Sequence, residues 1–354
     1  MNEVLQRLSE TIRDAKAAGR ALCIRGGGTK EFYGRTASGA PLDVTPYAGV
    51  VSYEPTELVI TARAGTPLAE VEKLLGAQGQ MLAFEPPHFG SGATWGGCIA
   101  TGFSGPRRPY AGSVRDVVLG VRMLDGEGGD LRFGGQVMKN VAGFDVSRLM
   151  VGALGTLGVI LEASAKTLPL PAHEATLRLR VTEAAAIETM NRWATQPLPI
   201  SATAFVDGVL TVRLSGALPG VRAAHARIGG DMVHDAEAKS FWTALREHTD
   251  LFFEGTKPLW RLSMPSSTAP LGLSGRTLIE WGGALRWLKS DIDTQRVRDA
   301  LTRVGGHATL FRYGDRSAGV LHPLAPGLMK LHQRLKRTLD PAGILNPGRM
   351  YPEL

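Results

Sequence analysis

Glycine residues are concentrated in three stretches in the N-terminal half of this chain, and this clustering constrains the fold more than any other feature. The stretches are residues 25–29 (Arg-Gly-Gly-Gly-Thr), 90–105 and 152–158. Low-complexity disorder would spread the 44 glycines evenly, so their grouping indicates turns and binding loops. Glycine has no Cβ, which lets backbone amides turn toward a ligand and lets the ligand come close. Because each stretch adjoins an apolar, strand-like run, the three predict a cradle for one long ligand rather than a single phosphate site.

The length and composition indicate a globular protein of two domains. A chain of 354 residues is too long for one ordinary domain, and a hydrophobic share of 44% provides an ample core. The net charge is +7, but lysine and arginine form no continuous run. We expect no nucleic-acid partner and a basic surface that is either solvated or faces a partner subunit. The densest basic group is expected to be one solvated face of a C-terminal helix: Lys330, Arg334, Lys336 and Arg337.

The cysteine count and the absence of targeting signals indicate the cellular compartment in which we expect the protein. Cys23 and Cys98 are the only cysteines, which gives neither a disulfide framework nor a metal or cluster ligand set. We therefore expect no metal site, a reducing compartment, and any iron–sulfur chemistry on another chain. The N-terminus has no signal-peptide pattern, and the uncharged run over residues 149–161 is too short to span a bilayer. We expect a cytoplasmic protein with no transmembrane segment.

Hydrophobic periodicity predicts an α+β protein in which the pattern of expected helices and strands changes near residue 172. After Pro169-Leu170-Pro171, a strand–helix–strand–strand–helix order predicts an antiparallel sheet with helices on one face. Helices are predicted at residues 2–19, 67–77, 183–194 and 221–228, strands at 21–24, 59–62, 117–124, 157–168, 176–181 and 307–312, and hairpin turns at Asp125-Gly126 and Asp207-Gly208.

The three glycine stretches differ in how strongly each indicates a ligand. The first could present consecutive N–H groups to a pyrophosphate, although an ordinary tight turn has the same residues; Glu31 in place of a third glycine excludes the Rossmann fingerprint. The second, predicted to be a 16-residue loop, carries Thr94, Thr101 and Ser104, whose hydroxyls suit phosphate and ring heteroatoms. Before the third, Asp145 is expected to bond to the local backbone.

Together the three stretches resemble the FAD-binding domain of the vanillyl-alcohol oxidase (PCMH-type) flavoproteins over residues 20–170. Residues 340–349 (Asp-Pro-Ala-Gly-Ile-Leu-Asn-Pro-Gly-Arg) resemble the closing signature of the 2-hydroxy-acid branch of that family. Residues 143–145 and 152–158 are most similar to the FAD-binding E subunits of glycolate oxidases. The resemblance implies that the first stretch holds the pyrophosphate, the second lines the pyrophosphate and isoalloxazine, and the third closes over the adenine and ribose.

The resemblance also implies a domain division and a set of site residues. It implies a PCMH-type FAD-binding domain of two α+β subdomains at 1–171, an α+β cap domain at 172–335, and a C-terminal segment, 336–354, that returns to the FAD domain. Covalent members often carry histidine directly after the first glycines; Thr29 here implies non-covalent FAD. The implied cofactor-binding residues are Arg25, Gly26, Gly27, Gly28, Thr29, Pro86, Gly92, Thr94, Gly96, Gly97, Ala100, Thr101, Ser104, Gly105, Arg115, Asp116, Gly155, Thr156, Gly158 and Ile160.

Catalytic residues are not identified by the sequence. Oxidation of a 2-hydroxy acid needs a hydride acceptor, a base and a cation for the carboxylate. The candidates His88, His307, His322 and Arg312 form no constellation, and the paired-histidine metal site of the family's catalytic relatives is missing. Valine at Gly27 or Gly97 is predicted to remove FAD while the fold persists.

Three functions follow from the resemblance and stay open at this point. The first is a FAD-binding oxidoreductase subunit of a glycolate-oxidising complex. It would pass electrons between a catalytic flavosubunit and an iron–sulfur subunit, in the cytoplasm or at the inner face of the membrane through the complex. The second is a self-sufficient FAD oxidoreductase of another small alcohol or hydroxy acid. The third is a non-catalytic scaffold with a vestigial flavin site.

Overall fold

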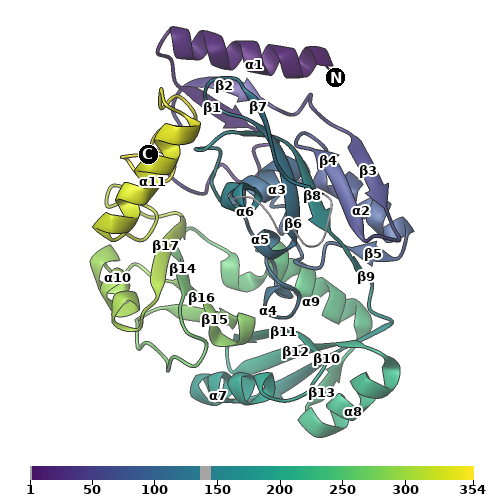
Figure 1. Ribbon diagram of the computed structural model, residues 1–354. Coiled ribbons are helices and arrows are strands. Elements are labelled where there is room, and N and C mark those ends of the chain that lie inside the picture. The colour runs from purple at the N-terminus through teal and green to yellow at the C-terminus, as the bar shows by residue number, and fades with distance from the viewer. Residues whose placement is uncertain (1, 136–144) are drawn as a thin grey trace. The chain divides into compact units, whose positions relative to one another are not determined.

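The computed structural model describes residues 2–135 and 145–354, which form two compact units (Figure 1). The first unit comprises Met1–Phe103, Ser113–Leu170 and Pro323–Leu354, and the second comprises Ser104–Gly112 and Pro171–His322. The second glycine stretch is therefore divided between the units. Residues 140–144, which include part of the wording that resembles the glycolate oxidase subunits, lie outside the described residues.

One layer of the first unit joins the two ends of the sequence. Leu8, Ile12 and Ala15 recur at helical spacing on one face of the first helix, and all three are buried. They pack in one cluster with Leu22 and Leu345, which also form a parallel bridge between the N-terminal and C-terminal parts of the chain. The elements of this layer are α1 (Asn2–Ala17) and the parallel pair β1 (Leu22–Arg25) and β2 (Ala40–Asp43).

The other layer of the first unit is a five-stranded antiparallel sheet in the order β3-β4-β8-β6-β7. Trp95, at the start of α3, is fully buried, and its Nε1 donates to the Ala163 carbonyl of β8 at 3.0 Å. The elements are β3 (Val50–Glu54), β4 (Val59–Arg63), β6 (Val118–Leu124), β7 (Asp130–Gly134), β8 (Val159–Lys166), the pair β5 (Gln80–Met81) and β9 (Leu168–Pro169), and the helices α2 (Leu68–Ala77), α3 (Trp95–Thr101), α5 (Val114–Val117), α6 (Val146–Met150) and α11 (Pro326–Leu339).

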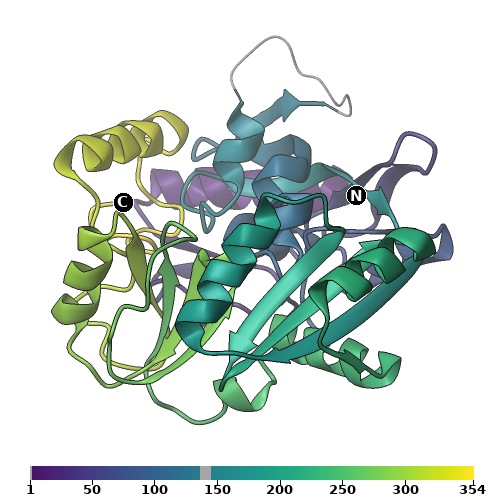
Figure 2. The same cartoon turned by 90° about the horizontal axis from the view of Figure 1, so that it is seen from below.

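The second unit is built on an eight-stranded antiparallel sheet in the order β13-β10-β12-β11-β15-β16-β14-β17. Figure 2 shows its strands side by side, from teal at β10 to light green at β17. The elements are β10 (His173–Arg180), β11 (Ile200–Val206), β12 (Val209–Gly216), β13 (Asp231–Val233), β14 (Leu259–Ser263), β15 (Arg276–Glu280), β16 (Leu285–Lys289), β17 (His307–Arg312), the helices α4 (Arg108–Ala111), α7 (Glu183–Ala194), α8 (Leu218–Ile228), α9 (Asp235–Glu247) and α10 (Thr294–Arg303), and the 3₁₀ turns η1 (Leu251–Phe253) and η2 (Trp281–Gly283). The predicted antiparallel sheet is confirmed.

The two helices predicted in this region, α7 and α8, lie on one face of the sheet as expected, and α9, which the sequence did not predict, covers the opposite face. Leu177 of β10 packs in a cluster with residues of α7 and α8. Its neighbour Thr176 faces the opposite side, because side chains alternate along a strand. There Thr176 accepts a hydrogen bond from Trp242 Nε1 of α9 at 3.0 Å, and the Arg213 guanidinium lies 5.0 Å from the Trp242 ring centroid. Because the residues on that face are polar, the sequence shows no apolar pattern there that would predict a covering helix. In the structure, α9 covers this face.

Local signals in the sequence predicted some elements well, whereas helix α3 was missed. The hairpin at Asp207-Gly208 is confirmed: both residues have positive φ, 49° and 78°, as a type I′ turn requires. The prediction that residues 90–105 form one loop is wrong, because α3 lies within them. Thr94 caps that helix by accepting from the Gly97 amide at 3.2 Å, and Gly102 ends it with φ of 65°.

The basic residues near the C-terminus do not share one solvated face. Lys330, Arg334 and Arg337 of α11 are exposed, but Lys336 is only 6% exposed. The prediction is wrong for Lys336 because its ammonium bonds to three oxygen atoms of the first unit.

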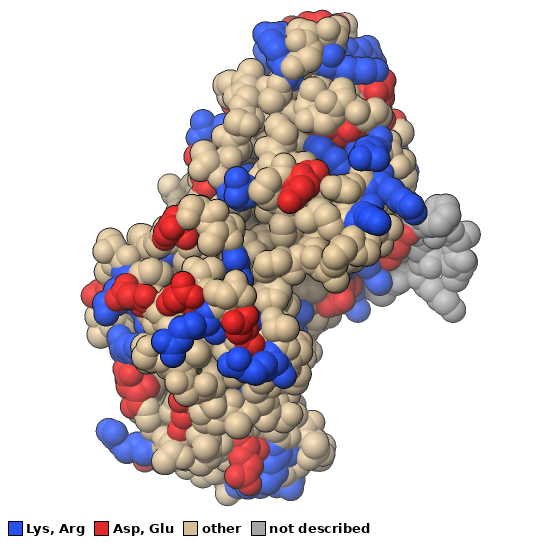
Figure 3. All heavy atoms as spheres, turned by 90° about the vertical axis from the view of Figure 1, so that its left-hand side faces the viewer, with Lys and Arg blue, Asp and Glu red and all other residues tan. Residues whose placement is uncertain are grey.

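On the face in Figure 3, Lys and Arg side chains lie among Asp, Glu and uncharged side chains rather than in one continuous tract. No helix in the described ranges combines the length and apolarity that a membrane span requires.

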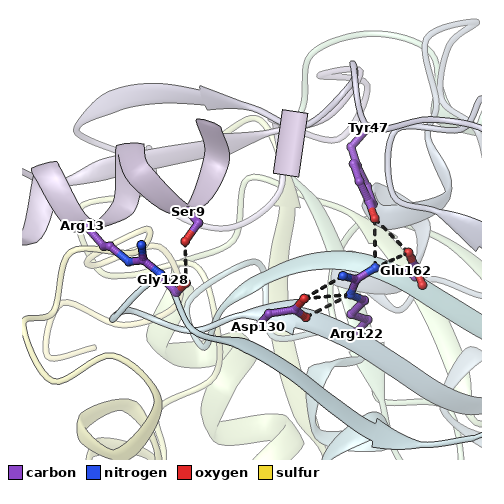
Figure 4. A network of polar contacts seen from close by, with 7 residues as sticks. All are labelled: Ser9, Arg13, Tyr47, Arg122, Gly128, Asp130 and Glu162. Carbon is purple, nitrogen blue, oxygen red and sulfur yellow. Dashed lines mark hydrogen bonds and ion pairs between the residues drawn. The ribbon is translucent and has the colours of Figure 1, made fainter. Parts of the chain in front are cut away.

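An arginine of the five-stranded sheet joins three neighbouring segments (Figure 4). Arg122 of β6 donates to both carboxylate oxygens of Asp130 on β7, the shortest contact being 2.7 Å, and to Glu162 of β8 at 2.9 Å. The Tyr47 hydroxyl donates to Glu162 at 2.8 Å and accepts from Arg122 at 3.2 Å. The network therefore fixes the register of three strands and holds the loop after β2 against them.

The charge on Asp130 is expected to make stability depend on pH. Its hydrogen bonds with Arg122 hold the pKa of Asp130 below the ordinary value. The folded state therefore binds fewer protons there than the unfolded state, whose aspartate titrates at about pH 3.9. The stabilisation is fully present above that pH and is lost as the pH falls through the lower, folded-state pKa.

We therefore expect the free energy of unfolding, measured by urea titration, to fall as the pH is lowered from about 4 through the folded-state pKa of Asp130. The fall should be smaller in Arg122→Met, in which the cause of the low pKa is gone. Equal pH slopes in the two proteins would show that the Arg122–Asp130 contact does not contribute.

Candidate functional site

A cavity of about 440 Å³ lies within the first unit, in the size range of small-molecule and cofactor sites. Its walls come from four parts of the sequence that the fold brings together. They are the end of β1 with the first glycine stretch, the segment around β2, helix α3, and the third glycine stretch with the C-terminal residues Asn346 and Arg349. Thus all three glycine stretches contribute to one concave site.

The first glycine stretch offers a row of unused hydrogen-bond donors to this cavity. Within the residues that the structure describes, the backbone N–H groups of Gly26, Gly27, Gly28 and Thr29 donate to no protein acceptor. All four residues line the cavity, and Gly28 has φ of 74°. Consecutive unused donors at the wall of a cavity form the kind of site that binds an anion. This arrangement fits a pyrophosphate.

Close backbone packing explains two glycines of this loop. A Cβ on Gly26 would come within 2.5 Å of Thr94 Oγ1, and a Cβ on Gly27 would overlap the carbonyl of Gly92. The first glycine stretch therefore packs on the Thr94 side chain and on the Gly92 backbone of the second stretch. Gly92 does not itself line the cavity but supports the loop that does.

Helix α3 supplies a flat wall rather than hydrogen-bond donors. The amides of Trp95 and Gly96 donate to the carbonyls of Thr66 and Ala64, both at 2.8 Å, and the Gly97 amide is used by the Thr94 cap. A Cβ on Gly97 would meet only Thr94 Oγ1, at 3.1 Å. Because Gly97 lines the cavity and its Cβ direction is otherwise open, the glycine leaves space that a ligand can fill.

The third glycine stretch meets the C-terminal segment at the cavity wall. Leu154 and Gly155 both have positive φ, 52° and 73°, and Leu154 is a strained position for a residue with a side chain. The Leu154 carbonyl accepts from Asn346 Nδ2 at 2.7 Å. A Cβ on Gly155 would come within 2.7 Å of the same nitrogen, so glycine there permits Asn346 to approach.

The charged groups at the cavity favour an anion. Three cations, Arg25, Lys30 and Arg349, line it against one carboxylate, Glu31. Arg25 pairs with Glu31 and is half-exposed. Lys30 is only 8% exposed, and its ammonium donates to the His88 carbonyl at 3.0 Å and to Thr29 Oγ1 at 3.3 Å. One buried and two partly exposed cations beside unused N–H groups suit the double negative charge of a pyrophosphate.

Comparisons with known proteins show which family shares this arrangement. The family model "FAD binding domain" matches residues 4–134, and "FAD linked oxidases, C-terminal domain" matches residues 320–350. Glycolate oxidase subunit GlcE of Escherichia coli (strain K12) is 49% identical over 349 residues, which cover 99% of this chain and 98% of that protein. The chain belongs to the PCMH-type FAD-linked oxidases.

More distant relatives agree with this assignment. Glycolate oxidase subunit GlcD of Bacillus subtilis (strain 168) is 33% identical over 130 residues, 36% of this chain and 27% of that protein. p-Cresol methylhydroxylase has the same fold, with a TM-score of 0.71 at 14% identity over 98% of this chain and 87% of that chain. As a PCMH-type FAD-linked oxidase, the chain is an oxidoreductase with FAD as its cofactor. The predicted family, fold class and cofactor are confirmed.

The structure brings most of the predicted site residues of this FAD-linked oxidase to the cavity and leaves seven away from it. The predicted residues that line it are Arg25, Gly26, Gly27, Gly28, Thr29, Thr94, Gly96, Gly97, Ala100, Thr101, Gly155, Gly158 and Ile160. Those that do not line it are Pro86, Gly92, Ser104, Gly105, Arg115, Asp116 and Thr156. Ser104 and Gly105 belong to the second unit, where the Gly105 carbonyl accepts from Trp281 Nε1 at 3.0 Å.

Three of the seven have structural contacts that account for them. Asp116 closes a capping box on α5 by accepting from the amide and hydroxyl of Ser113, both at 2.8 Å. Arg115 donates to the Val151 carbonyl at 3.1 Å. The Thr156 hydroxyl donates to the Ala153 carbonyl at 2.7 Å. Their assignment as cofactor-binding residues stays a prediction.

The prediction for Asp145 is confirmed. Its Oδ1 accepts from the Arg148 amide at 3.2 Å, which caps α6. The carboxylate also pairs with the Arg148 side chain at 3.1 Å. Asp145 therefore serves the start of a helix and does not line the cavity.

Sequence reasoning missed Lys30, Asn346 and Arg349 as site residues. Lys30 follows the first glycine stretch directly, and that position is the only sequence signal for it. Asn346 and Arg349 lie in the C-terminal segment whose resemblance to a family signature was recognised without individual roles. Only the fold places them beside residues more than 300 positions earlier.

The candidate bases and the carboxylate clamp do not line the cavity. His88 Nε2 lies 2.9 Å from Glu72 Oε2. His307, His322 and Arg312 belong to the second unit, and burial is the main cause that lowers the pKa of each. The catalytic base therefore stays unassigned.

The cysteines and acidic residues do not gather into a metal site in the part of the chain that the structure describes. No group of three or more His, Cys, Asp or Glu side chains there could hold a metal ion. Cys23 lines the cavity, whereas Cys98 is a buried residue of α3, and burial raises the pKa of its thiol to about 12. Cys98 therefore stays protonated and unreactive near neutral pH.

Proposed function

We propose that this chain is the FAD-binding subunit of a complex that oxidises glycolate or a closely similar 2-hydroxy acid. The observation that carries the proposal is the 49% identity to glycolate oxidase subunit GlcE over 99% of the chain and 98% of that relative. Identity along the whole length, rather than in the FAD domain alone, supports a shared role and not only a shared cofactor. The relative is named as a subunit, which supports a multi-subunit assembly for this chain too.

We further propose that the chain holds FAD without a covalent bond. Thr29 stands where covalent members of the family carry histidine, and neither histidine nor tyrosine is among the described residues that line the cavity. The amides of residues 26–29, with Lys30 and Arg349, would hold the pyrophosphate, and Gly97 would leave space for the ligand. When bound, FAD accepts a hydride equivalent and returns electrons singly or in pairs.

The proposed role of this subunit is electron transfer between a catalytic flavosubunit and an iron–sulfur subunit. A 2-hydroxy acid loses two electrons and two protons when it becomes a 2-oxo acid, which requires a base and a cation near the flavin. The base and clamp candidates among the described residues lie outside the cavity, which favours substrate oxidation on a partner flavosubunit. Two cysteines cannot ligate a cluster that needs four, so the iron–sulfur centre would belong to another chain.

Flavin spectroscopy on the purified chain tests this function. The isolated protein is expected to be yellow and to release its flavin into the supernatant when it is precipitated with acid. Glycolate or D-lactate alone should leave the flavin absorbance unchanged. The absorbance should bleach when the catalytic flavosubunit from the same organism is added under anaerobic conditions with glycolate.

Three outcomes would contradict parts of the proposal separately. Bleaching by substrate without any partner would show that the chain is a self-sufficient oxidoreductase. Flavin that stays with the precipitated protein would show a covalent bond. A chain that cannot be reconstituted with FAD would contradict the cavity assignment itself.

A further inference from the structure

A buried lysine–aspartate pair lies behind the cavity wall, in a helix whose other cations are exposed. Lys336 of α11 is 6% exposed and Asp340 is 1% exposed. The Lys336 ammonium donates to Asp340 Oδ2 at 2.7 Å, to the Leu345 carbonyl at 2.6 Å and to the Thr156 carbonyl at 2.8 Å. An ammonium has three N–H donors, so all three are used. Burial of such a pair is costly unless every polar atom is satisfied, as it is here.

Asp340 uses its carboxylate to fold the C-terminal segment around the pair. Its Oδ2 also accepts from the Leu345 amide at 2.8 Å, and its Oδ1 accepts from the Ile344 amide at 3.2 Å. Lys336 and Asp340 thereby hold both the amide and the carbonyl of Leu345. The position of the next residue, Asn346, follows from this.

Asn346 joins the first and third glycine stretches at the cavity. Its Oδ1 accepts from the amide of Ile24, next to the first stretch, at 2.7 Å, and its Nδ2 donates to the Leu154 carbonyl of the third stretch at 2.7 Å. Its backbone amide donates to Leu22 of β1 at 3.0 Å. Asn346 has φ of 42°, a left-handed conformation that asparagine tolerates better than most residues. Arg349, three residues later, also lines the cavity.

We infer that Lys336 and Asp340 are positioning residues for FAD, and that docking of the C-terminal segment and binding of FAD are coupled. The pair holds Asn346 in place, and Asn346 sets the separation between the two glycine stretches that face the cofactor. A cofactor that contacts both stretches and Arg349 binds the docked segment better than the undocked one. By linkage, FAD then stabilises docking by the same factor by which docking strengthens FAD binding. The inference rests on the non-covalent FAD of the proposed function and not on the identity of the substrate.

Lys336→Met tests the pair against Lys330→Met, a matched control on the exposed face of the same helix. Methionine keeps much of the apolar length of lysine but donates no hydrogen bond. We expect the dissociation constant of FAD, measured by quenching of flavin fluorescence on the apo-protein, to rise at least about tenfold in Lys336→Met. It should stay within about twofold of wild type in the control.

Limited trypsin digestion measures docking without any variant. Cleavage after Arg349, followed by mass spectrometry, should be at least about tenfold slower in wild-type protein saturated with FAD than in the apo-protein. Cleavage after Arg334, exposed in the middle of α11, is the internal control and should change little. This measurement shows whether FAD protects the C-terminal segment, and the FAD affinity of Lys336→Met against Lys330→Met shows whether the buried pair takes part.

Asn346→Ala provides a second variant if Lys336→Met does not fold. It leaves the buried pair intact and removes only the side-chain bonds to Ile24 and Leu154. It should also weaken FAD binding about tenfold. The inference is wrong if FAD leaves cleavage after Arg349 unchanged in the wild type, or if the folded variants bind FAD as tightly as Lys330→Met. Covalent FAD would be recognised beforehand, since acid would not release the flavin, so failure of the proposed function is distinguishable from failure of this inference.

Discussion

Gly97→Val is expected to abolish FAD binding while the protein stays folded. Gly97 lines the cavity, and the direction of its missing Cβ is open except for Thr94 Oγ1 at 3.1 Å. A valine there would occupy space that the cofactor needs. We expect FAD affinity to fall at least about a hundredfold, which corresponds to about 2.8 kcal/mol. Glycine is a poor helix former, so the apo-protein should unfold at an unchanged or slightly higher urea concentration, a gain of up to about 0.5 kcal/mol.

The flavin-to-protein ratio and a urea titration of the apo-protein check both halves of this prediction. Gly76→Val is the matched control, because Gly76 lies on the exposed side of α2 with nothing within 4 Å of its Cβ direction. Stoichiometric FAD in Gly97→Val would contradict the assignment of the cavity. Gly27→Val is a poorer test than the sequence suggested. Its Cβ would overlap the Gly92 carbonyl, so it should displace the neighbouring loop as well as the cofactor.

Arg122→Met is expected to destabilise the first unit by about 3 kcal/mol. The substitution would leave Glu162, whose side chain is 14% exposed, as a carboxylate without its cation, and would remove a donor from the buried Tyr47 hydroxyl. The partner Asp130 is 38% exposed and contributes less, because water screens that contact. Urea unfolding should show the loss as a lower midpoint with an unchanged slope.

A double-mutant cycle with Glu162→Leu separates the ion pair from simple loss of packing. Because a buried charge without a partner is the main cost, Arg122→Met/Glu162→Leu should be less destabilised than the sum of the two single variants. Arg7→Met on the exposed side of α1 is the control and should unfold like wild type. Additive effects in the cycle would mean that the two side chains do not stabilise each other.

The local elements with clear sequence signals could be predicted, whereas α3 could not. Helix α7 occupies Glu183–Ala194 as predicted, because its apolar residues recur at helical spacing and Thr182 caps its start. Helix α3 contains Gly96 and Gly97, which argue against a helix. It forms because tertiary contacts override that propensity. Trp95 is buried against β8, and Gly96 packs so closely on Ala64 that a Cβ would come within 2.6 Å.

The sequence by itself predicted that the three glycine stretches of this chain serve one long ligand, and their resemblance to the PCMH-type family predicted that the ligand is FAD. These signals are local, since glycine acts where it stands, by freeing the backbone and removing a side chain. The tertiary structure alone decided that Lys336 is buried and that Asn346 and Arg349 complete the cavity wall. Charge pattern predicts solvent exposure for a lysine, and only partners distant in sequence, such as the Thr156 carbonyl, can reverse that. Such contacts form only between segments that the fold brings together. The pattern of residues along the chain does not show which distant segments will meet.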